Sequence, residues 1–266
     1  MRWSLLVVLA AVAGCARPAG PDAPPTSATG PPPGREGGPA RVLLFSRTAG
    51  FRHASIPAAV AALRRQGARQ GMEVDHTEDP ARLSAAGLRR YRAVVFLSTT
   101  GDVLGPDGEA ALRGFVEAGG GWVGVHAAAD TEYGWPWYET LVGARFARHP
   151  PVQRATVRVA GRDHPATARL PQVWARTDEW YDFRGNPRGR VRVLATLDES
   201  TYQGGGMGAD HPIAWCHAVG EGRALYTAGG HTAASWAEAR FLAHVAGALR
   251  WAAGLAAGDC RPEPEG

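Results

Sequence analysis

Short apolar runs separated by helical patterns constrain this chain more than any other feature of its sequence. The runs at residues 41–46, 93–98 and 121–125 are the length of buried strands. Between them, apolar residues recur at helical spacing over residues 55–70, and a helix that begins near Pro106 ends at Gly119-Gly120. With a short strand at 73–76, this alternation predicts an α/β fold whose parallel sheet is covered on both faces.

The pattern changes after residue 144. Residues 152–159 and 191–197 alternate in the manner of antiparallel or edge strands, and residues 213–218 and 223–228 read as a hairpin. A last helix is expected over residues 234–251. These segments predict antiparallel strands added to the parallel sheet.

The first forty residues have the composition of a targeting segment. Residues 1–14 carry one arginine and a short apolar stretch, which is typical of a signal peptide, and Cys15 follows small residues as in a bacterial lipobox. Residues 15–40, rich in Pro and Gly, are expected to be a disordered tether, followed by a folded domain over 41–253 and a tail over 254–266. These features predict a lipid-anchored, extracytoplasmic protein of the bacterial cell envelope, although ordinary cleavage beside an incidental cysteine is the alternative.

Composition excludes several kinds of chemistry. All 29 basic residues counted as Lys or Arg are arginines, so Schiff-base and P-loop lysine mechanisms are excluded. The formal charge is +4, without a long basic run, and we therefore expect no nucleic-acid partner. Outside the cytoplasm, Cys216 and Cys260 could form a disulfide or remain two thiols.

Three histidines follow predicted strands. His53 comes after the first strand, His126 directly after the strand at 121–125, and His231 after the last strand. Ligands of open α/β sheets bind beyond the carboxyl ends of the strands, so these side chains are expected to share one rim. The alternative is that each one caps a loop or a helix. Four other histidines are interpreted as structural or exposed: His76, His149, His164 and His244.

Two further clusters suggest a site. Asp178 and Glu179 precede Trp180 and Tyr181, and carboxylates beside aromatic rings suit the recognition of sugars. An exposed acidic loop with core aromatics is the simpler interpretation. His211 begins the other cluster, His-Pro-Ile-Ala-Trp.

Five motifs together resemble the ThuA family of trehalose-utilisation proteins over residues 41–253. They are Gly-Phe-Arg-His-Ala-Ser at 50–55, Gly-Val-His-Ala-Ala at 124–128, Asp-Glu-Trp-Tyr at 178–181, His-Pro-Ile-Ala-Trp at 211–215 and Gly-Gly-His at 229–231. The resemblance is strongest to the secreted bacterial branch and implies a fold similar to class I glutamine amidotransferases. That fold is a flavodoxin-like three-layer sandwich, in which a mostly parallel sheet has inserted antiparallel strands. In those enzymes a cysteine nucleophile occupies the turn where this chain has His126, so a cysteine-dependent glutaminase is not expected.

The resemblance implies a carbohydrate substrate, either a disaccharide such as trehalose or its 3-keto derivative. We expect His126 to be the general acid or base, with Glu179 or Asp178 as its partner carboxylate. Residues expected to bind substrate are His53, Arg52, Trp180, Tyr181, His211 and His231. As a variant, His53, His126 and His231 could bind a divalent metal such as Zn²⁺. The alternative function is a non-catalytic sugar-binding lipoprotein that serves a neighbouring sugar dehydrogenase or transporter.

Overall fold

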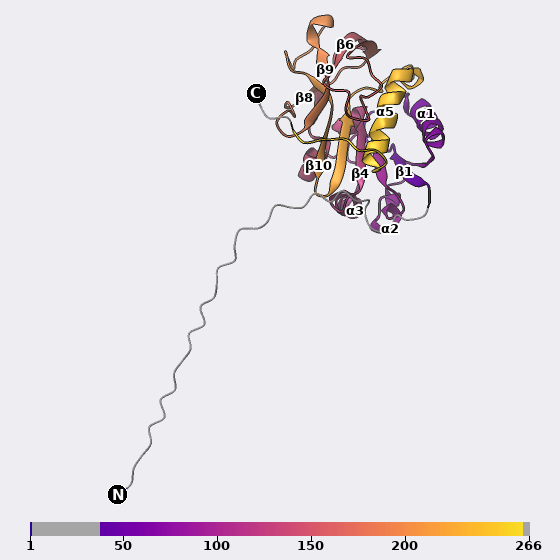
Figure 1. Ribbon diagram of the computed structural model, residues 1–266, viewed down its shortest axis with the longest axis vertical. Helices are drawn as coiled ribbons and strands as arrows, with labels where there is room; N and C mark the ends of the chain where they lie inside the picture. The colour runs from indigo at the N-terminus through magenta and orange to yellow at the C-terminus, as the bar shows by residue number, and fades with distance from the viewer. Residues whose placement is uncertain (2–37, 263–266) are drawn as a thin grey trace.

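The computed structural model describes Met1 and residues 38–262 (Figure 1). The signal peptide, Cys15 and nearly all of the expected tether lie outside the described residues. None of the described helices is both long and apolar enough to cross a membrane. The elements in chain order are β1 (Ala40–Phe45), α1 (Ile56–Arg69), β2 (Met72–Thr77), η1 (Pro80–Arg82), α2 (Ala85–Leu88), β3 (Ala93–Leu97), α3 (Pro106–Glu117), β4 (Gly121–Val125), η2 (His126–Asp130), α4 (Pro136–Val142), β5 (Phe146–Arg148), β6 (Gln153–Val159), β7 (Val173–Asp178), β8 (Asp182–Phe183), β9 (Arg192–Asp198), η3 (Glu199–Thr201), β10 (Pro212–Val219), β11 (Gly222–Thr227), η4 (Ser235–Ala237) and α5 (Ala239–Ala252).

One sheet of nine strands, in the order β2-β1-β3-β4-β11-β10-β9-β6-β7, organises the described chain. The first five strands in this order are parallel to one another. From β10 onward each strand is antiparallel to its neighbour, and β10 and β11 form the predicted hairpin. Figure 1 shows β6 and β9 at the end of the molecule away from α2 and α3. The mixed α/β fold class is therefore confirmed.

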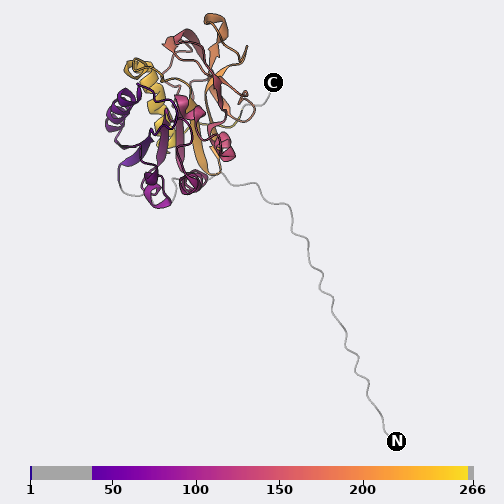
Figure 2. The ribbon, with the colours of Figure 1, turned by 180° about the vertical axis from the view of Figure 1, so that it is seen from behind.

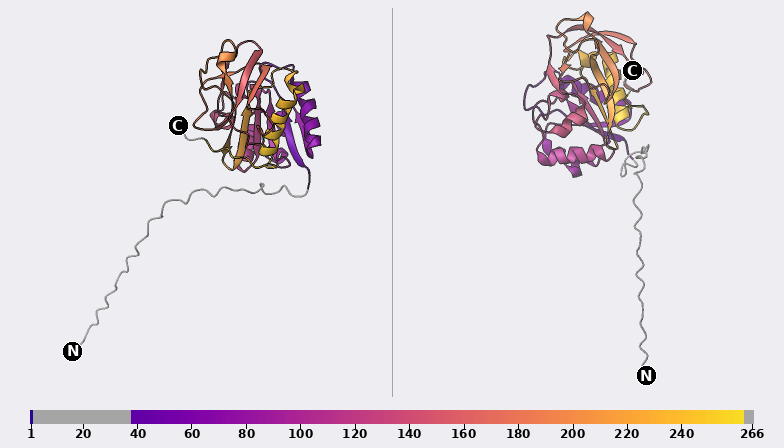
Figure 3. Two further views of the ribbon diagram at one scale, coloured as in Figure 1. Left: turned by 45° about the horizontal axis from the view of Figure 1, so that its top comes forward. Right: turned by 90° about the vertical axis from the view of Figure 1, so that its left-hand side faces the viewer.

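Helices cover the parallel half of the sheet on both faces. Helices α1 and α5 lie side by side, which can be seen from the front and from behind (Figures 1 and 2) and again in the left view of Figure 3. A Cβ on Gly121 of β4 would meet the backbone of Ala252 in α5, and one on Gly222 of β11 would meet Val116 in α3. Because Gly121 is paired with Arg223, the residue after Gly222, the two glycines face opposite sides. Helices α5 and α3 therefore cover opposite faces, as a three-layer sandwich requires.

The structure differs from the sequence prediction in the start of the last helix and in several elements that were not predicted. The last helix begins at Ala239 rather than at residue 234, because residues 235–237 form a separate 3₁₀ turn in which the backbone N–H of Ser235 donates to the hydroxyl of Thr232. Helices α2 and α4 and strands β5, β7 and β8 were not predicted; all of these except β7 are short, and β7 lies at the edge of the sheet.

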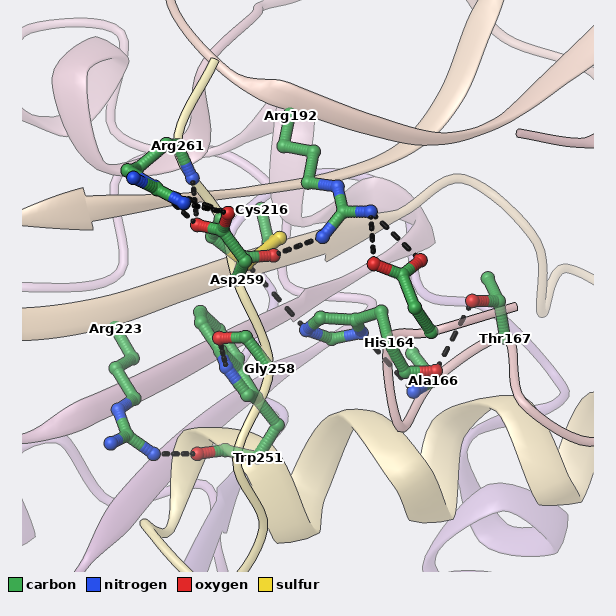
Figure 4. The surroundings of a disulfide bond; sticks show 12 residues. His164, Ala166, Thr167, Arg192, Cys216, Arg223, Trp251, Gly258, Asp259 and Arg261 are labelled. Atoms are coloured by element: carbon green, nitrogen blue, oxygen red, sulfur yellow. Dashed lines mark hydrogen bonds and ion pairs between the residues drawn. A yellow bond between two sulfur atoms is a disulfide. The ribbon is translucent and has the colours of Figure 1, made fainter. Parts of the chain in front are cut away.

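A disulfide joins Cys216 in β10 to Cys260 beyond α5 (Figure 4). The sequence leaves open whether these cysteines form a disulfide or remain two thiols, and the structure has the disulfide. Hydrogen bonds hold the same segment: Arg192 donates to the carbonyl of Asp259 at 2.7 Å, and the indole of Trp251 donates to the carbonyl of Gly258 at 3.0 Å. The segment that follows α5 is thus attached to the sheet.

Candidate active site

Three imidazoles meet at the carboxyl edge of the parallel strands. His53 lies between β1 and α1, His126 follows β4, and His231 follows β11. The Nε2 atom of His126 is 3.1 Å from Nε2 of His53 and 3.1 Å from Nδ1 of His231. The structure therefore brings together the three histidines that the strand ends predict.

His126 is held rigidly at the centre of this group. Its side chain is fully buried, and its φ of 52° lies in the left-handed region, which costs a non-glycine residue about 1–2 kcal/mol. Its Nδ1 lies 2.8 Å from the carbonyl oxygen of Ala228. The hydroxyl of Tyr226 donates to the backbone carbonyl of His126 at 2.8 Å. Because a carbonyl only accepts, Nδ1 of His126 carries a proton, and the lone pair of the neutral ring is on Nε2.

Glu179 completes the cluster from the end of β7. Its Oε2 lies 3.4 Å from Nε2 of His126 and 3.1 Å from Nδ1 of His231, while Oε1 lies 3.1 Å from Nδ1 of His149. Burial alone would raise the pKa of Glu179, but hydrogen bonds with His126 and His231 lower it well below its usual range. The carboxyl group is therefore ionised throughout the neutral range.

The pKa values of two of the imidazoles move in opposite directions. The hydrogen bond to Glu179 raises the pKa of His231 above its usual value. Burial, together with the neighbouring His126 and His231, lowers the pKa of His53 to about 3. His53 is consequently a neutral imidazole at physiological pH.

Asp178 supports the cluster without facing it. It is fully buried, and its carboxylate accepts hydrogen bonds from the backbone N–H groups of Glu179, Gly230 and His231 at 3.0, 2.8 and 3.1 Å. Arg176 also donates to it, at 2.7 Å. The loop before His231 depends on glycine, since Gly230 has a φ of 115°. Of the two carboxylates expected to act with a histidine, the structure places Glu179 in the cluster and makes Asp178 a residue that positions it.

A pocket of about 200 Å³ opens over the cluster. Its walls are lined by Phe51, His53, Asp130, Phe146, His149, Glu179, Tyr181 and His231. Phe51 has 67% of its surface exposed, which is unusual for this side chain and leaves its ring available to a ligand. The ring of Tyr181 lies 4.3 Å from those of His126 and Phe146. The site thus combines a polar floor with aromatic walls.

Three residues expected to bind substrate do not line this pocket. Arg52 forms an exposed ion pair with Glu78 at 2.7 Å. Trp180 is fully buried, and its indole donates to a backbone carbonyl at 2.9 Å. His211 is also fully buried, with its two nitrogens 2.8 Å from Glu199 and from the carbonyl of Tyr181. Their positions make them part of the framework around the site.

His149 lines the pocket. From the sequence it was interpreted as a structural or exposed histidine. Its Nδ1 lies 3.1 Å from both Oε1 of Glu179 and the carbonyl oxygen of Pro150, and its ring stacks on Tyr181. Because both neighbours are acceptors, Nδ1 carries a proton, and Nε2 has the lone pair of the neutral ring. No strand-end position marks His149 in the sequence; only the two prolines that follow it set it apart.

Fold and site together define a class: a mixed α/β protein with a histidine–carboxylate cluster at the carboxyl edge of its parallel strands. Residues 41–252 match the family model described as ThuA, trehalose utilisation. Since the match covers most of the chain, the protein belongs to the ThuA family. No curated protein matches the chain.

Solved structures agree with this assignment. A protein of Bacteroides uniformis ATCC 8492 described as ThuA-like is 25% identical, with a TM-score of 0.70 over 82% of this chain and 92% of that one. A ThuA-like protein of Parabacteroides merdae ATCC 43184 is 21% identical, with a TM-score of 0.68 over 81% of this chain and 90% of that one. A β-galactosidase of Bacillus circulans sp. alkalophilus is 15% identical, with a TM-score of 0.53 over 80% of this chain and 31% of that one, a likeness of fold alone.

Proposed function

We propose that this ThuA-family protein is an enzyme that acts on disaccharides of the trehalose type or on their 3-keto derivatives. The observation that carries the proposal is the pocket itself, in which the imidazoles of His53 and His231 and the ionised carboxylate of Glu179 form the floor and aromatic rings form the walls. Aromatic faces bind the apolar faces of sugar rings, and the polar floor is suited to sugar oxygens. Family membership supports a role related to trehalose utilisation.

The chemistry that best suits these groups is proton transfer next to a sugar carbonyl. A base removes the proton from the carbon beside the carbonyl, and the electrons of that C–H bond form a C=C bond while the carbonyl oxygen becomes anionic. In an isomerisation the proton then returns to the former carbonyl carbon, while the hydroxyl proton of the deprotonated carbon moves to the former carbonyl oxygen, so that the carbonyl has moved by one carbon. In an elimination the carbonyl forms again and the oxygen substituent leaves from the carbon next to the deprotonated one. The departing oxygen takes up a proton, and a C=C bond remains in the sugar.

His149 is suited to carry that proton, because its Nδ1–H is bonded to Glu179 and its Nε2 is the basic atom in the wall of the pocket. This assignment replaces His126, which was expected from the sequence to be the acid or base. The Nε2 of His126 is buried among His53, His231 and Glu179, where a substrate proton cannot reach it directly. Asp178 faces away from the pocket, so Asp178 and Glu179 do not form the opposed pair of carboxylates that glycosidase chemistry needs.

We also propose that the protein is lipid-anchored through Cys15 in the bacterial cell envelope, outside the cytoplasm. The Cys216–Cys260 disulfide supports an oxidising compartment. A 3-keto sugar arises by oxidation of a sugar hydroxyl, so a sugar dehydrogenase is the class of enzyme that would supply this substrate.

The test is to incubate the protein with trehalose and with its 3-keto derivative and to follow the sugar by chromatography. We expect turnover by the wild type and by Glu199→Gln, which changes a glutamate bonded to His211 outside the pocket, but not by Glu179→Gln. If every variant binds the sugar and none converts it, the protein is instead the sugar-binding lipoprotein that was the alternative. Turnover by Glu179→Gln at the wild-type rate would place the reaction elsewhere.

A further inference from the structure

We propose that the cluster is a divalent metal site in which Nε2 of His53, Nε2 of His126, Nδ1 of His231 and Oε2 of Glu179 bind one zinc-like ion. The inference deepens the proposed function, on which it rests only for the role of the ion in catalysis. The four residues each offer one ligand atom, and these atoms all lie within 4.8 Å of one another.

The spacing of the ligand atoms fits a small tetrahedral ion. With Zn–N and Zn–O bonds of 2.0–2.2 Å, the ligand atoms of a tetrahedral site are about 3.3–3.6 Å apart. His126 Nε2 is 3.1 Å from His53 Nε2, 3.1 Å from His231 Nδ1 and 3.4 Å from Glu179 Oε2, and the last two atoms are 3.1 Å from each other. The three separations of 3.1 Å lie slightly below this range and the separation of 3.4 Å lies within it, so a small outward shift of these side chains would convert hydrogen-bond contact into coordination.

The arrangement of lone pairs also favours a cation at the centre. In the neutral ring of His126, whose Nδ1–H donates to Ala228, the Nε2 lone pair points towards the cluster. Oε2 of Glu179, 3.4 Å away, presents a lone pair to the same space. An ion between these two atoms would accept both lone pairs.

Groups outside the ligand set hold each ligand in place, as they do in metal sites. The carbonyl of Ala228 fixes the tautomer of His126, and His149 holds the second oxygen of Glu179. Asp178 binds the backbone N–H groups of both Glu179 and His231. A site prepared in this way loses little conformational entropy when it binds an ion.

The ligand types select the kind of ion. Three imidazoles and one carboxylate suit Zn²⁺ and its first-row neighbours, whereas Mg²⁺ and Ca²⁺ need oxygen ligands. Imidazole binds a metal through a ring nitrogen that carries no proton.

Two other groups of potential ligands in the described chain are already occupied. His164 lies beside Cys216 and Cys260, whose sulfurs are joined in the disulfide. Asp182 and Glu199 lie beside His211, but Arg148 pairs with Asp182 at 2.7 Å and His211 pairs with Glu199 at 2.8 Å. Within residues 38–262 the active-site cluster is thus the group best suited to an ion.

The position of the site suggests what the ion would do. His53, Glu179 and His231 line the pocket, so an ion bound to them would face a sugar bound there. A bound divalent ion polarises a carbonyl and stabilises the oxygen anion that forms when the neighbouring C–H bond breaks. The ion would supply the electrophile of the proposed reaction, and His149 would move the proton.

The experiment uses the full chain without added histidines, stripped with chelator and then titrated with Zn²⁺ by calorimetry and with Co²⁺ by visible absorption. We expect one ion per chain and the absorption of tetrahedral or five-coordinate Co²⁺. His126→Ala and Glu179→Gln should weaken Zn²⁺ binding at least tenfold. His76→Gln, which changes a histidine bonded to Ser46 away from the cluster, should bind as the wild type does.

The outcomes separate this inference from the proposed function. No stoichiometric ion in the wild type, or unchanged binding in both cluster variants, would overturn the metal site. Because His126→Ala could unfold the domain, circular dichroism of each variant is recorded, and the near-isosteric Glu179→Gln and the wild-type Co²⁺ spectrum provide independent evidence. Keto-sugar turnover by the stripped protein would refute the role of the ion in catalysis and leave the proposed reaction standing. A bound ion without turnover would refute only the proposed reaction.

Discussion

Replacing Asp178 by Asn should destabilise the fold more than any other single change of a carboxylate to an amide near the site. The carboxylate is fully buried and accepts hydrogen bonds from Arg176, Ser235 and three backbone N–H groups. An amide places its NH₂ group against some of these donors, and Arg176 keeps only its bond with Glu238, at 2.9 Å. Breaking a buried ion pair costs about 3–5 kcal/mol.

That free energy converts into a large change in melting temperature. For a domain of this size, 1 kcal/mol corresponds to about 2–4 °C, so Asp178→Asn should lower the melting temperature by about 6–20 °C. Thermal unfolding followed by circular dichroism measures it. Asp163→Asn is the control, since Asp163 forms an exposed ion pair with Arg192 and should leave the melting temperature nearly unchanged. A decrease of less than about 2 °C for Asp178→Asn would refute the argument that Asp178 holds the site together.

Three further predictions concern the disulfide, pH and location. Reduction, or Cys260→Ser, should lower the free energy of unfolding by about 4 kcal/mol, because Cys216 and Cys260 are 44 residues apart; denaturant titration with equal midpoints in both states would contradict this. Burial lowers the pKa of His164 and of His244 to about 4, so the unfolded chain binds more protons than the folded one between that value and the unfolded pKa of about 6.5. The melting temperature should therefore decrease as the pH is lowered from about 6.5 to 4, and His244→Gln should flatten the curve; an unchanged slope would show that this histidine is not responsible. Cys15→Ser should move the protein from the membrane fraction to the soluble fraction, and its retention in membranes would count against the lipid anchor.

The sequence predicted the meeting of the three histidines because a general rule of α/β topology applies to them. His53, His126 and His231 each follow a strand of the parallel half, and carboxyl ends of parallel strands share one edge. The apolar runs of β1, β3 and β4 were equally clear because those strands are buried on both faces.

The choice between Asp178 and Glu179 could not be made from the sequence. Residues next to each other along an extended chain point to opposite sides, but which side faces the pocket depends on where β7 pairs in the sheet. Pairing with β6 turns Asp178 into the core, towards Gly230 and Arg176, and leaves Glu179 at the cluster.

His149 was missed for a different reason. It lies in a loop between β5 and β6, and its contact with Glu179 joins segments 30 residues apart in sequence. Loop conformation of this kind follows from tertiary packing, here from the rings of Phe146 and Tyr181 against that of His149. No periodicity in the sequence reports such packing.

The central claim, proton transfer beside a sugar carbonyl at this pocket, is tested most directly by proton NMR of the 3-keto derivative of trehalose in D₂O. The wild type should remove the signal of the hydrogen next to the carbonyl faster than buffer alone, through either exchange or elimination. Glu179→Gln should leave that signal at the buffer rate, and Glu199→Gln should behave as the wild type does. A sugar that is bound by the wild type while its signal persists at the buffer rate would contradict the claim.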